Sequence, residues 1–461
     1  MRHHVVLIPG FGGFDVLGQI QYYTGITSFV DRWRKDPTGD NLDLRRTVEL
    51  HYFDNLPTAA VGTRADRLTK YLAKRIARGS FQRADKLILV GHSTGGLDIR
   101  KLLQDLRLHP DNPIPVDNDA NAVTASEILH VMSRIVFLSV PQYGTNIADW
   151  TISHNVERRI GISLISGFAS TVLQVVPGKI IDVLGGFLLA QNLREAIRDA
   201  VRESSVILAG DDPVKLANAR EAASELRLWL ENIDKDFLAI QDLRNIDKVS
   251  IPNMGADDDS DEPDDKVSPA HYPPETRRRE TTFWGDNGIK SMSFATLGKN
   301  AHPYKAGSPG DTWNPISLWG PYITSIKGCD STYAAAWLAC ASGGFDTNTE
   351  ADRSLKDIDD TQVKRRMEQW ENDGIVNTAS MLWPNEEKTI LVHGDHADII
   401  GHYKLDPPEV PGVVPAQDGS RQHDRYDLFV SAEDDGIDKF DDERFEKVWT
   451  KIFDFCIRQI D

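Results

Sequence analysis

The stretch KLILVGHSTGG, residues 86–96, indicates the fold of this chain more than any other part of the sequence. Leu87 to Val90 is a continuous apolar run, which is typical of a strand buried on both faces of a parallel sheet. A helix-like segment, residues 97–106, follows the two glycines at its end. The pattern G-x-S-x-G between strand and helix predicts a sharp turn that lifts Ser93 clear of the sheet.

Ser93 is the candidate nucleophile of this turn. The turn forces the serine into a strained backbone conformation, and Gly91 and Gly95 are small enough to avoid a clash around it. The serine oxygen would lie at the positive end of the following helix dipole. A glycine-rich turn with an incidental serine is the plain alternative, but the strand before it, the helix after it and the extra Gly96 disfavour that interpretation. We therefore predict a serine hydrolase.

The rest of the chain supports a parallel sheet wrapped by helices. Apolar runs predict further strands, and an amphipathic pattern predicts helices before the turn and at the end of the chain. The predicted strands are residues 5–8, 134–140, 291–297 and 388–392, and the predicted helices are residues 63–78 and 441–460. Strands that alternate with helices are typical of an α/β fold. We predict one α/β-hydrolase domain over residues 1–461, with a mostly parallel central sheet.

Two insertions interrupt this pattern. We expect residues 150–290 to form an inserted helical cap, and residues 299–370 to form a second insertion. Residues 160–178 carry no charged side chain, and a soluble monomer would not expose so large an apolar patch. We therefore expect the cap to line an acyl pocket. Glycines, serines and Pro177 interrupt the run, so a stable membrane span is not expected.

A tetrahedral intermediate needs two N–H donors aimed at its oxygen. One donor is expected from Thr94, the residue after the nucleophile. The other is expected from the glycine-rich loop after the first strand, residues 9–13, and we assign it to the Phe11 N–H. Glycines allow this backbone to approach a substrate closely.

In hydrolases of this kind the acid and the histidine follow the serine in the chain. Asp373 lies in a turn, within Asn-Asp-Gly, before an apolar pair. His396 lies in the loop after the strand that ends near residue 392, where the base is needed. His393 is still within the strand and His402 is the third candidate. We predict that His396 is the base and that Asp373 stabilises its imidazolium form.

The net charge of the chain limits the classes of partner that it is expected to bind. The net charge of −18 argues against nucleic acid and against anionic membranes, because both attract basic surfaces. A small-molecule or lipid ester remains compatible with it. The strand signal begins at residue 5 without a preceding signal segment, so we expect a cytoplasmic protein or the mature form of a secreted one. The sequence does not predict an oligomeric state.

Five segments together resemble the bacterial triacylglycerol lipases of the calcium-dependent type. They match the oxyanion loop, the lead into the first long helix, the nucleophile turn, the next strand end, and the acid and histidine turns. In this sequence they are residues 9–26, 56–64, 91–100, 139–150, and 372–376 with 395–398. The resemblance implies an α/β-hydrolase fold and hydrolysis of esters with apolar acyl chains through an acyl-enzyme. A polyester depolymerase, an amidase or a thioesterase could use the same residues, and a non-catalytic binding protein is a further alternative.

The resemblance also implies a structural calcium ion. In the family, an aspartate two residues after the catalytic histidine binds calcium together with an aspartate some twenty residues before the catalytic acid. The matching residues here are Asp398 and Asp352. Such an ion would fix the loop that carries His396 and would take no part in the chemistry, for which no cofactor is expected.

Overall fold

The structure is a computed structural model. It describes residues 1–13, 16–17, 20–37, 41–116, 122–153, 238–249, 267–298, 340, 344–347, 349, 352–384, 389–403 and 440–458. Helices within these ranges are all too short or too polar to cross a membrane.

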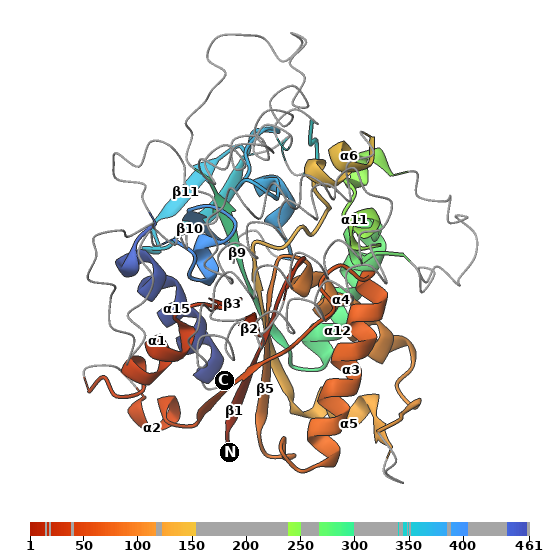
Figure 1. The fold of residues 1–461 in the computed structure, drawn as a ribbon, viewed down its shortest axis with the longest axis vertical. Coiled ribbons are helices and arrows are strands. Elements are labelled where there is room, and N and C mark those ends of the chain that lie inside the picture. The colour runs from red at the N-terminus through yellow and green to blue at the C-terminus, as the bar shows by residue number, and fades with distance from the viewer. Residues whose placement is uncertain are drawn as a thin grey trace, which may run out of the picture.

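An eight-stranded sheet lies at the centre (Figure 1). Its order is β11-β10-β12-β9-β8-β5-β1-β4, and every neighbouring pair is parallel except β10 and β11. The strands are β1 (His3–Ile8), β4 (Val48–Tyr52), β5 (Lys86–His92), β8 (Met132–Leu138), β9 (Lys290–Leu297), β10 (Arg353–Asp357), β11 (Gln362–Arg365) and β12 (Thr389–His393). Two short hairpins, β2 (Val16–Leu17) with β3 (Ile20–Gln21) and β6 (Pro113–Ile114) with β7 (Val123–Thr124), lie outside it.

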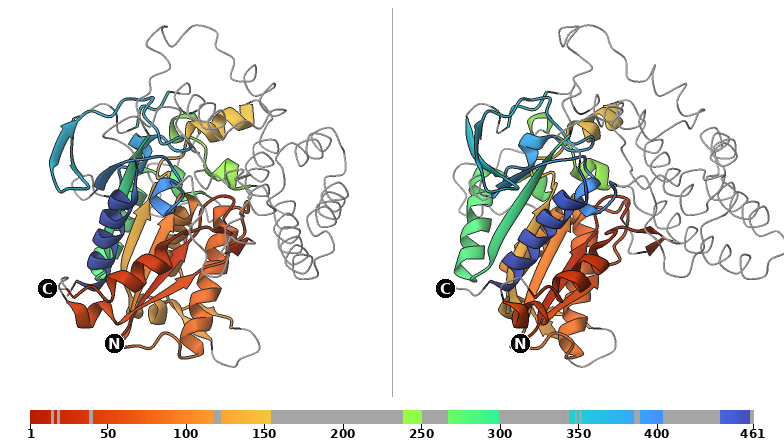
Figure 2. Two further views of the ribbon diagram at one scale, coloured as in Figure 1. Left: turned by 60° about the vertical axis from the view of Figure 1, so that its left-hand side comes forward. Right: turned by 90° about the vertical axis from the view of Figure 1, so that its left-hand side faces the viewer.

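Helices cover both faces of the sheet (Figures 1 and 2). On one face, Val5 and Leu7 of β1 pack in a core with α1 (Ile26–Trp33) and α15 (Asp442–Ile457). On the other face, Val6 and Ile8 pack with α3 (Val61–Ala77), α4 (Thr94–Leu108), α5 (Ala125–Val131) and Trp284 of α12 (Pro274–Asp286). Shorter helices are α2 (Leu42–Arg45), α6 (Asn146–Ser153) and α11 (Ala239–Asp242), with 3₁₀ turns η1 (Ile246–Lys248), η2 (Pro269–His271), η3 (Thr378–Met381) and η5 (Asp398–Ile400).

This mostly parallel sheet with helices on both faces is an α/β-hydrolase fold, which confirms the predicted fold class. The chain reverses its direction of winding at β1, because β4 and β5 pair with opposite edges of that strand. In open α/β sheets, ligands bind in the crevice outside the carboxyl ends of the strands at such a reversal. The loop after β1 and the turn after β5 meet at this point, and they carry Phe11 and Ser93.

The two predicted insertions differ from the structure where it describes them. Residues 353–365, placed in the second insertion, form β10 and β11 at the edge of the central sheet. Residues 274–286, placed in the cap, form α12, which packs against α4 and leads into β9. Residues 154–237 and 250–266, which make up most of the predicted cap, lie outside the described residues, so the acyl-pocket prediction stays a prediction.

Candidate active site

Ser93 occupies a strained position between β5 and α4. Its φ is 53° and its ψ is −130°, a region that residues other than glycine rarely adopt. A side-chain carbon at Gly91 would lie 2.7 Å from the Gly95 backbone, and one at Gly95 would lie 2.5 Å from the Ile8 carbonyl oxygen. The glycines on either side of the serine are therefore required by the tight packing of this turn.

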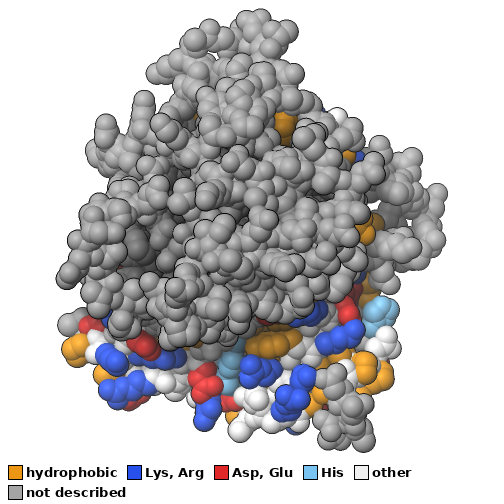
Figure 3. All heavy atoms as spheres, in the orientation of Figure 1, with side chains coloured by type: hydrophobic (Ala, Val, Ile, Leu, Met, Phe, Trp, Pro, Cys, Tyr) orange, Lys and Arg blue, Asp and Glu red, His pale blue; other side chains and the backbone are white. Residues whose placement is uncertain are grey.

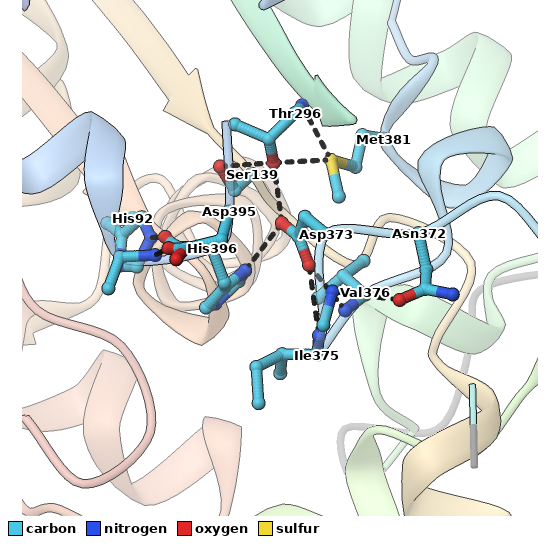
Figure 4. A network of polar contacts seen from close by, with 12 residues as sticks. His92, Ser139, Thr296, Asn372, Asp373, Ile375, Val376, Met381, Asp395 and His396 are labelled. Atoms are coloured by element: carbon cyan, nitrogen blue, oxygen red, sulfur yellow. Dashed lines mark hydrogen bonds and ion pairs between the residues drawn. The ribbon is translucent and has the colours of Figure 1, made fainter. Parts of the chain in front are cut away.

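Asp373 and His396 contact one another directly (Figure 4). The Nδ1 atom of His396 lies 2.7 Å from Oδ2 of Asp373, which is fully buried. The backbone joins them as well, since the His396 N–H donates to the Asp373 carbonyl at 2.9 Å. A carboxylate only accepts, so His396 donates through Nδ1 and the neutral ring carries its lone pair on Nε2.

Backbone amides hold the other oxygen of the Asp373 carboxylate. Its Oδ1 accepts from the N–H groups of Ile375 and Val376 at 3.1 and 2.8 Å. The Thr296 hydroxyl, at the end of β9, donates to Oδ2. The carboxylate is thus fixed on both oxygens without exposure to solvent, which is what a group that orients a histidine requires.

The oxyanion loop approaches the serine closely. A side-chain carbon at Gly10 would lie 2.5 Å from the Ser93 Cβ. Only a glycine fits there, and the next residue, Phe11, is thereby brought beside the nucleophile. The Gly12 N–H donates to the Pro57 carbonyl at 2.7 Å, which ties the loop to the segment before α3.

Arg64 of α3 also holds the oxyanion loop in place. Its guanidinium donates to the Pro9 carbonyl at 2.8 Å and to the Gly10 carbonyl at 3.2 Å, and it forms a fully buried ion pair with Asp98 at 2.9 Å. In a trans peptide the N–H points opposite to the C=O. The Phe11 N–H, which shares a peptide with the Gly10 carbonyl, therefore points away from Arg64.

We expect Arg64→Met to lower the free energy of unfolding by about 3–5 kcal/mol, because it leaves the Asp98 carboxylate buried without its partner. A urea titration measures this. Arg67→Met is the matched control, since Arg67 pairs with Asp54 on the surface and such pairs contribute about 0–1 kcal/mol. Equal losses in the two variants would contradict the structural role of Arg64.

His92, which precedes Ser93, joins the oxyanion loop to the histidine loop. Its Nε2 lies 2.8 Å from the His396 carbonyl oxygen, and its Nδ1 lies 2.6 Å from the Tyr22 hydroxyl. Burial lowers the pKa of His92 well below its usual value, so the ring is neutral. A carbonyl only accepts, so Nε2 donates and Nδ1 accepts from Tyr22.

The Tyr22 hydroxyl in turn accepts from the Gly10 N–H at 2.8 Å. Burial raises the pKa of Tyr22, which keeps the hydroxyl protonated and able to donate to His92. The chain Gly10, Tyr22, His92, His396 therefore holds the oxyanion loop, the serine turn and the histidine loop in one arrangement. The sequence analysis did not identify this chain of hydrogen bonds.

We expect Tyr22→Phe to lower kcat/KM for ester hydrolysis about 10- to 100-fold, because the Gly10 N–H and His92 Nδ1 lose their common partner. The loss should fall mainly on kcat, since the loop stabilises charge that develops during reaction. Steady-state kinetics of Tyr22→Phe and Tyr52→Phe measure it, because the Tyr52 hydroxyl contacts Thr27 on the exposed side. An unchanged kcat in Tyr22→Phe would contradict this role.

Thr94 is the first residue of α4, so the helix offers its N–H no internal partner. The residue is fully buried, and among the described residues its hydroxyl has no hydrogen-bond partner. The Thr94 backbone donor follows Ser93 directly in the chain, as its predicted role as an oxyanion donor requires.

The serine turn and the histidine loop lie side by side, since His92, the residue before Ser93, contacts His396. Among the described residues, no hydrogen bond joins the Ser93 hydroxyl to His396, whose ring centroid is 4.6 Å from that of His92. Such contacts are often long in substrate-free enzymes and shorten when the substrate binds. His393 is the last residue of β12, and the Nε2 of His402 contacts the Tyr22 carbonyl at 3.0 Å. Of the three histidines, only His396 has a hydrogen bond to Asp373 among the described contacts.

The predicted calcium ligands lie at opposite ends of the sheet. Lys356 of β10 is opposite Ile390 of β12, and Asp352 comes four residues before Lys356. Asp398 packs against Gly394, four residues after Ile390. At about 3.3 Å per strand residue the separation is roughly 20 Å or more, which two ligands of one ion cannot span.

The pair Asp352 and Asp398 therefore does not fit one calcium ion. Asp352 is exposed, and an oxygen of Asp398 accepts the Asp395 N–H at 2.8 Å. Calcium binding by other groups stays a prediction, and no step proposed below involves a metal.

Several solved structures are similar to this chain at low identity. EstA from Clostridium botulinum is 14% identical, with 87% of this chain and 83% of that chain covered and a TM-score of 0.37. Lipase BlEst2 from Bacillus licheniformis is 12% identical, with coverages of 87% and 86% and a TM-score of 0.34. Lipase 1 from Pelosinus fermentans is 14% identical, with coverages of 87% and 94% and a TM-score of 0.40. These TM-scores are below 0.5, so the likeness is no basis for assigning an activity.

Protein-family models and curated proteins gave no match to the chain.

Proposed function

We propose that this chain is a serine-dependent carboxylic ester hydrolase of the lipase and esterase type. The observation that carries the proposal is the contact of 2.7 Å between Asp373 and the Nδ1 of His396, in a chain whose strand-to-helix turn holds Ser93 at a φ of 53°. A carboxylate that orients an imidazole, together with a serine on a strained strand-to-helix turn, is the arrangement that activates a hydroxyl for attack.

The proposed reaction passes through an acyl-enzyme. Nε2 of His396 takes the proton of Ser93 as the serine oxygen attacks the ester carbonyl carbon. The Phe11 and Thr94 N–H groups stabilise the negative oxygen of the tetrahedral intermediate. His396 then gives its proton to the leaving alcohol. A water molecule, activated by the same nitrogen, hydrolyses the acyl-enzyme and restores Ser93.

Apolar side chains around the site favour substrates with apolar acyl chains. Phe11, within the oxyanion loop, and Ile375, within the acid turn, are each partly exposed. Burial of methylene groups against such side chains contributes about 0.8 kcal/mol each, so binding should improve as the acyl chain grows.

A substrate panel tests the proposal. Purified full-length protein is assayed with p-nitrophenyl esters of increasing acyl length and with a p-nitroanilide of the same acyl group. We expect every ester to be hydrolysed, longer esters with a higher kcat/KM than the acetate, and the anilide at least about 10³-fold more slowly. Faster cleavage of the anilide would instead indicate an amidase, and no cleavage of any ester would contradict the proposal.

A further inference from the structure

A second group of ligand-type side chains lies at the end of the sheet away from Ser93. It consists of His4 on β1 with Glu49 and His51 on β4, near the beginning of each strand. In Figure 1 this is the lower end, where the N-terminus is marked. Figure 3 shows that the described surface there carries basic, acidic and histidine side chains side by side.

The register of the two strands brings these residues together. His4 is opposite Glu49, and Val6 is opposite His51. Residues opposite one another share a face of the sheet, and so do residues two apart on one strand. His4, Glu49 and His51 therefore point to the same face. The Nδ1 of His4 lies 3.0 Å from the Nε2 of His51 and 3.4 Å from an oxygen of Glu49.

Asp85, just before β5, fixes the orientation of the His4 ring. Its Oδ2 lies 3.3 Å from the Nε2 of His4, and its two oxygens also accept the N–H groups of Arg2 and Gln82 at 2.8 and 3.0 Å. An ionised carboxylate only accepts, so the neutral His4 ring donates through Nε2. The lone pair of His4 is then on Nδ1, and it faces His51 and Glu49.

This arrangement leaves acceptors facing one another. The Nδ1 lone pair of His4 and the nearer carboxylate oxygen of Glu49 are 3.4 Å apart, and neither can donate to the other. The other oxygen of Glu49 is paired with Arg2 at 2.8 Å. The Nε2 of His51 can donate to the Nδ1 of His4 at 3.0 Å, so a bound cation would replace that hydrogen bond and the proton on His51.

We propose that His4, Glu49 and His51 bind a divalent transition-metal ion of the zinc class. Two imidazole nitrogens and one carboxylate oxygen are ligands that Zn²⁺ accepts, with a water molecule in the fourth position. Ligand atoms about 2.0–2.1 Å from a tetrahedral ion are roughly 3.3 Å apart. The three ligand atoms here all lie within 4.8 Å of one another, and two of their separations are 3.0 and 3.4 Å.

The neighbouring groups fit this role. Asp85 accepts from the Nε2 of His4, the ring nitrogen that faces away from the proposed ion, and a carboxylate commonly orients a metal-binding histidine in this way. His4 is 1% exposed, whereas the Glu49 side chain is 40% exposed and gives an ion access from solvent. The ion would join β1 to the edge strand β4 and would lie at the far end of the sheet from the serine. Binding of the ion would therefore stabilise the edge of the sheet and would not affect the hydrolase chemistry.

Zinc binding is measured on the full chain without a histidine tag, after treatment with EDTA. Calorimetric titration with Zn²⁺ should give one ion per chain, and Zn²⁺ should raise the melting temperature. Co²⁺ should give visible absorption bands of a tetrahedral site. His51→Ala and Glu49→Gln should each weaken binding at least about 10-fold, and Asp85→Asn about 10- to 100-fold.

His130→Ala is the matched control, because His130 is an exposed histidine on α5 that is not one of the three ligands and accepts from Arg83 at 3.2 Å. It should bind Zn²⁺ as the unaltered chain does. If His51→Ala fails to fold, as judged by circular dichroism, the conservative Glu49→Gln decides. Absence of binding in the unaltered chain, or unchanged binding in His51→Ala or Glu49→Gln, would overturn the proposal.

Discussion

Ser93→Ala should abolish ester hydrolysis and leave the fold intact. The change removes only the hydroxyl that attacks the carbonyl carbon, so we expect kcat to fall about 10⁴-fold or more. The alanine keeps a side-chain carbon in the same turn, where the Ser93 side chain is packed against Gly10. The stability change should therefore be small. Initial rates on a p-nitrophenyl ester and a urea titration measure the two effects.

The matched control is Ser139→Ala. Ser139 also has a positive φ, of 51°, and follows the neighbouring strand β8, but its hydroxyl contacts Thr296 at 2.9 Å. This variant should retain most of its activity. Ser93→Ala with more than a tenth of the original kcat, in protein free of contaminating esterase, would contradict the role of Ser93 as nucleophile.

His396→Ala should lower kcat by about 10⁴-fold or more, because the serine loses the base that takes its proton. His393→Ala should keep nearly full activity, since its side chain belongs to the end of β12. His402→Ala should cost less than His396→Ala, because the Nε2 of His402 contacts a backbone group, the Tyr22 carbonyl, at 3.0 Å. Steady-state kinetics of the three variants separate these roles. A fully active His396→Ala, or an inactive His393→Ala, would contradict the assignment.

A double variant adds a sharper test. Residues that act as one catalytic unit show strongly non-additive losses. Ser93→Ala with His396→Ala should be no slower than Ser93→Ala alone. A further loss comparable to that of His396→Ala by itself would mean that the histidine acts in a different step from the serine.

The central strands could be predicted because burial on both faces leaves a clear signal. Each of β1, β5, β8 and β9 includes an apolar run or an apolar half that the sequence analysis identified. The two edge strands, β4 and β11, and the strand β10 beside β11 could not be predicted. β4 reads VELHY, and β10 and β11 read RSLKD and QVKR, so they mix charged and apolar residues. An edge strand is half-exposed and lacks the continuous apolar run.

The same limit applies to the site. Ser93, Asp373 and His396 were predicted from the motifs and their order along the chain. The contacts that support these three residues were not predicted, because such contacts join residues that are far apart in the sequence. His92 contacts the His396 carbonyl across 304 positions, and Thr296 contacts Asp373 across 77. No local pattern encodes such a pairing.

The predicted pairing of Asp352 with Asp398 shows the limit of spacing along the chain. A short spacing, His396 to Asp398, was matched to a second aspartate chosen from an acidic stretch. Spacing along the chain did not reveal that β10 carries Asp352 to the opposite end of the sheet. The His4 cluster was missed for a related reason, since its ligands are brought together only by the register of β1 and β4.

Covalent labelling with a fluorophosphonate tests the central claim most directly, because only an activated serine reacts quickly with such a probe. The full chain is treated with the probe, digested, and analysed by mass spectrometry. We predict one probe per chain, on the peptide that contains Ser93, with no label in Ser93→Ala and much slower labelling in His396→Ala. An unlabelled chain, or a label on any other residue, would contradict the account.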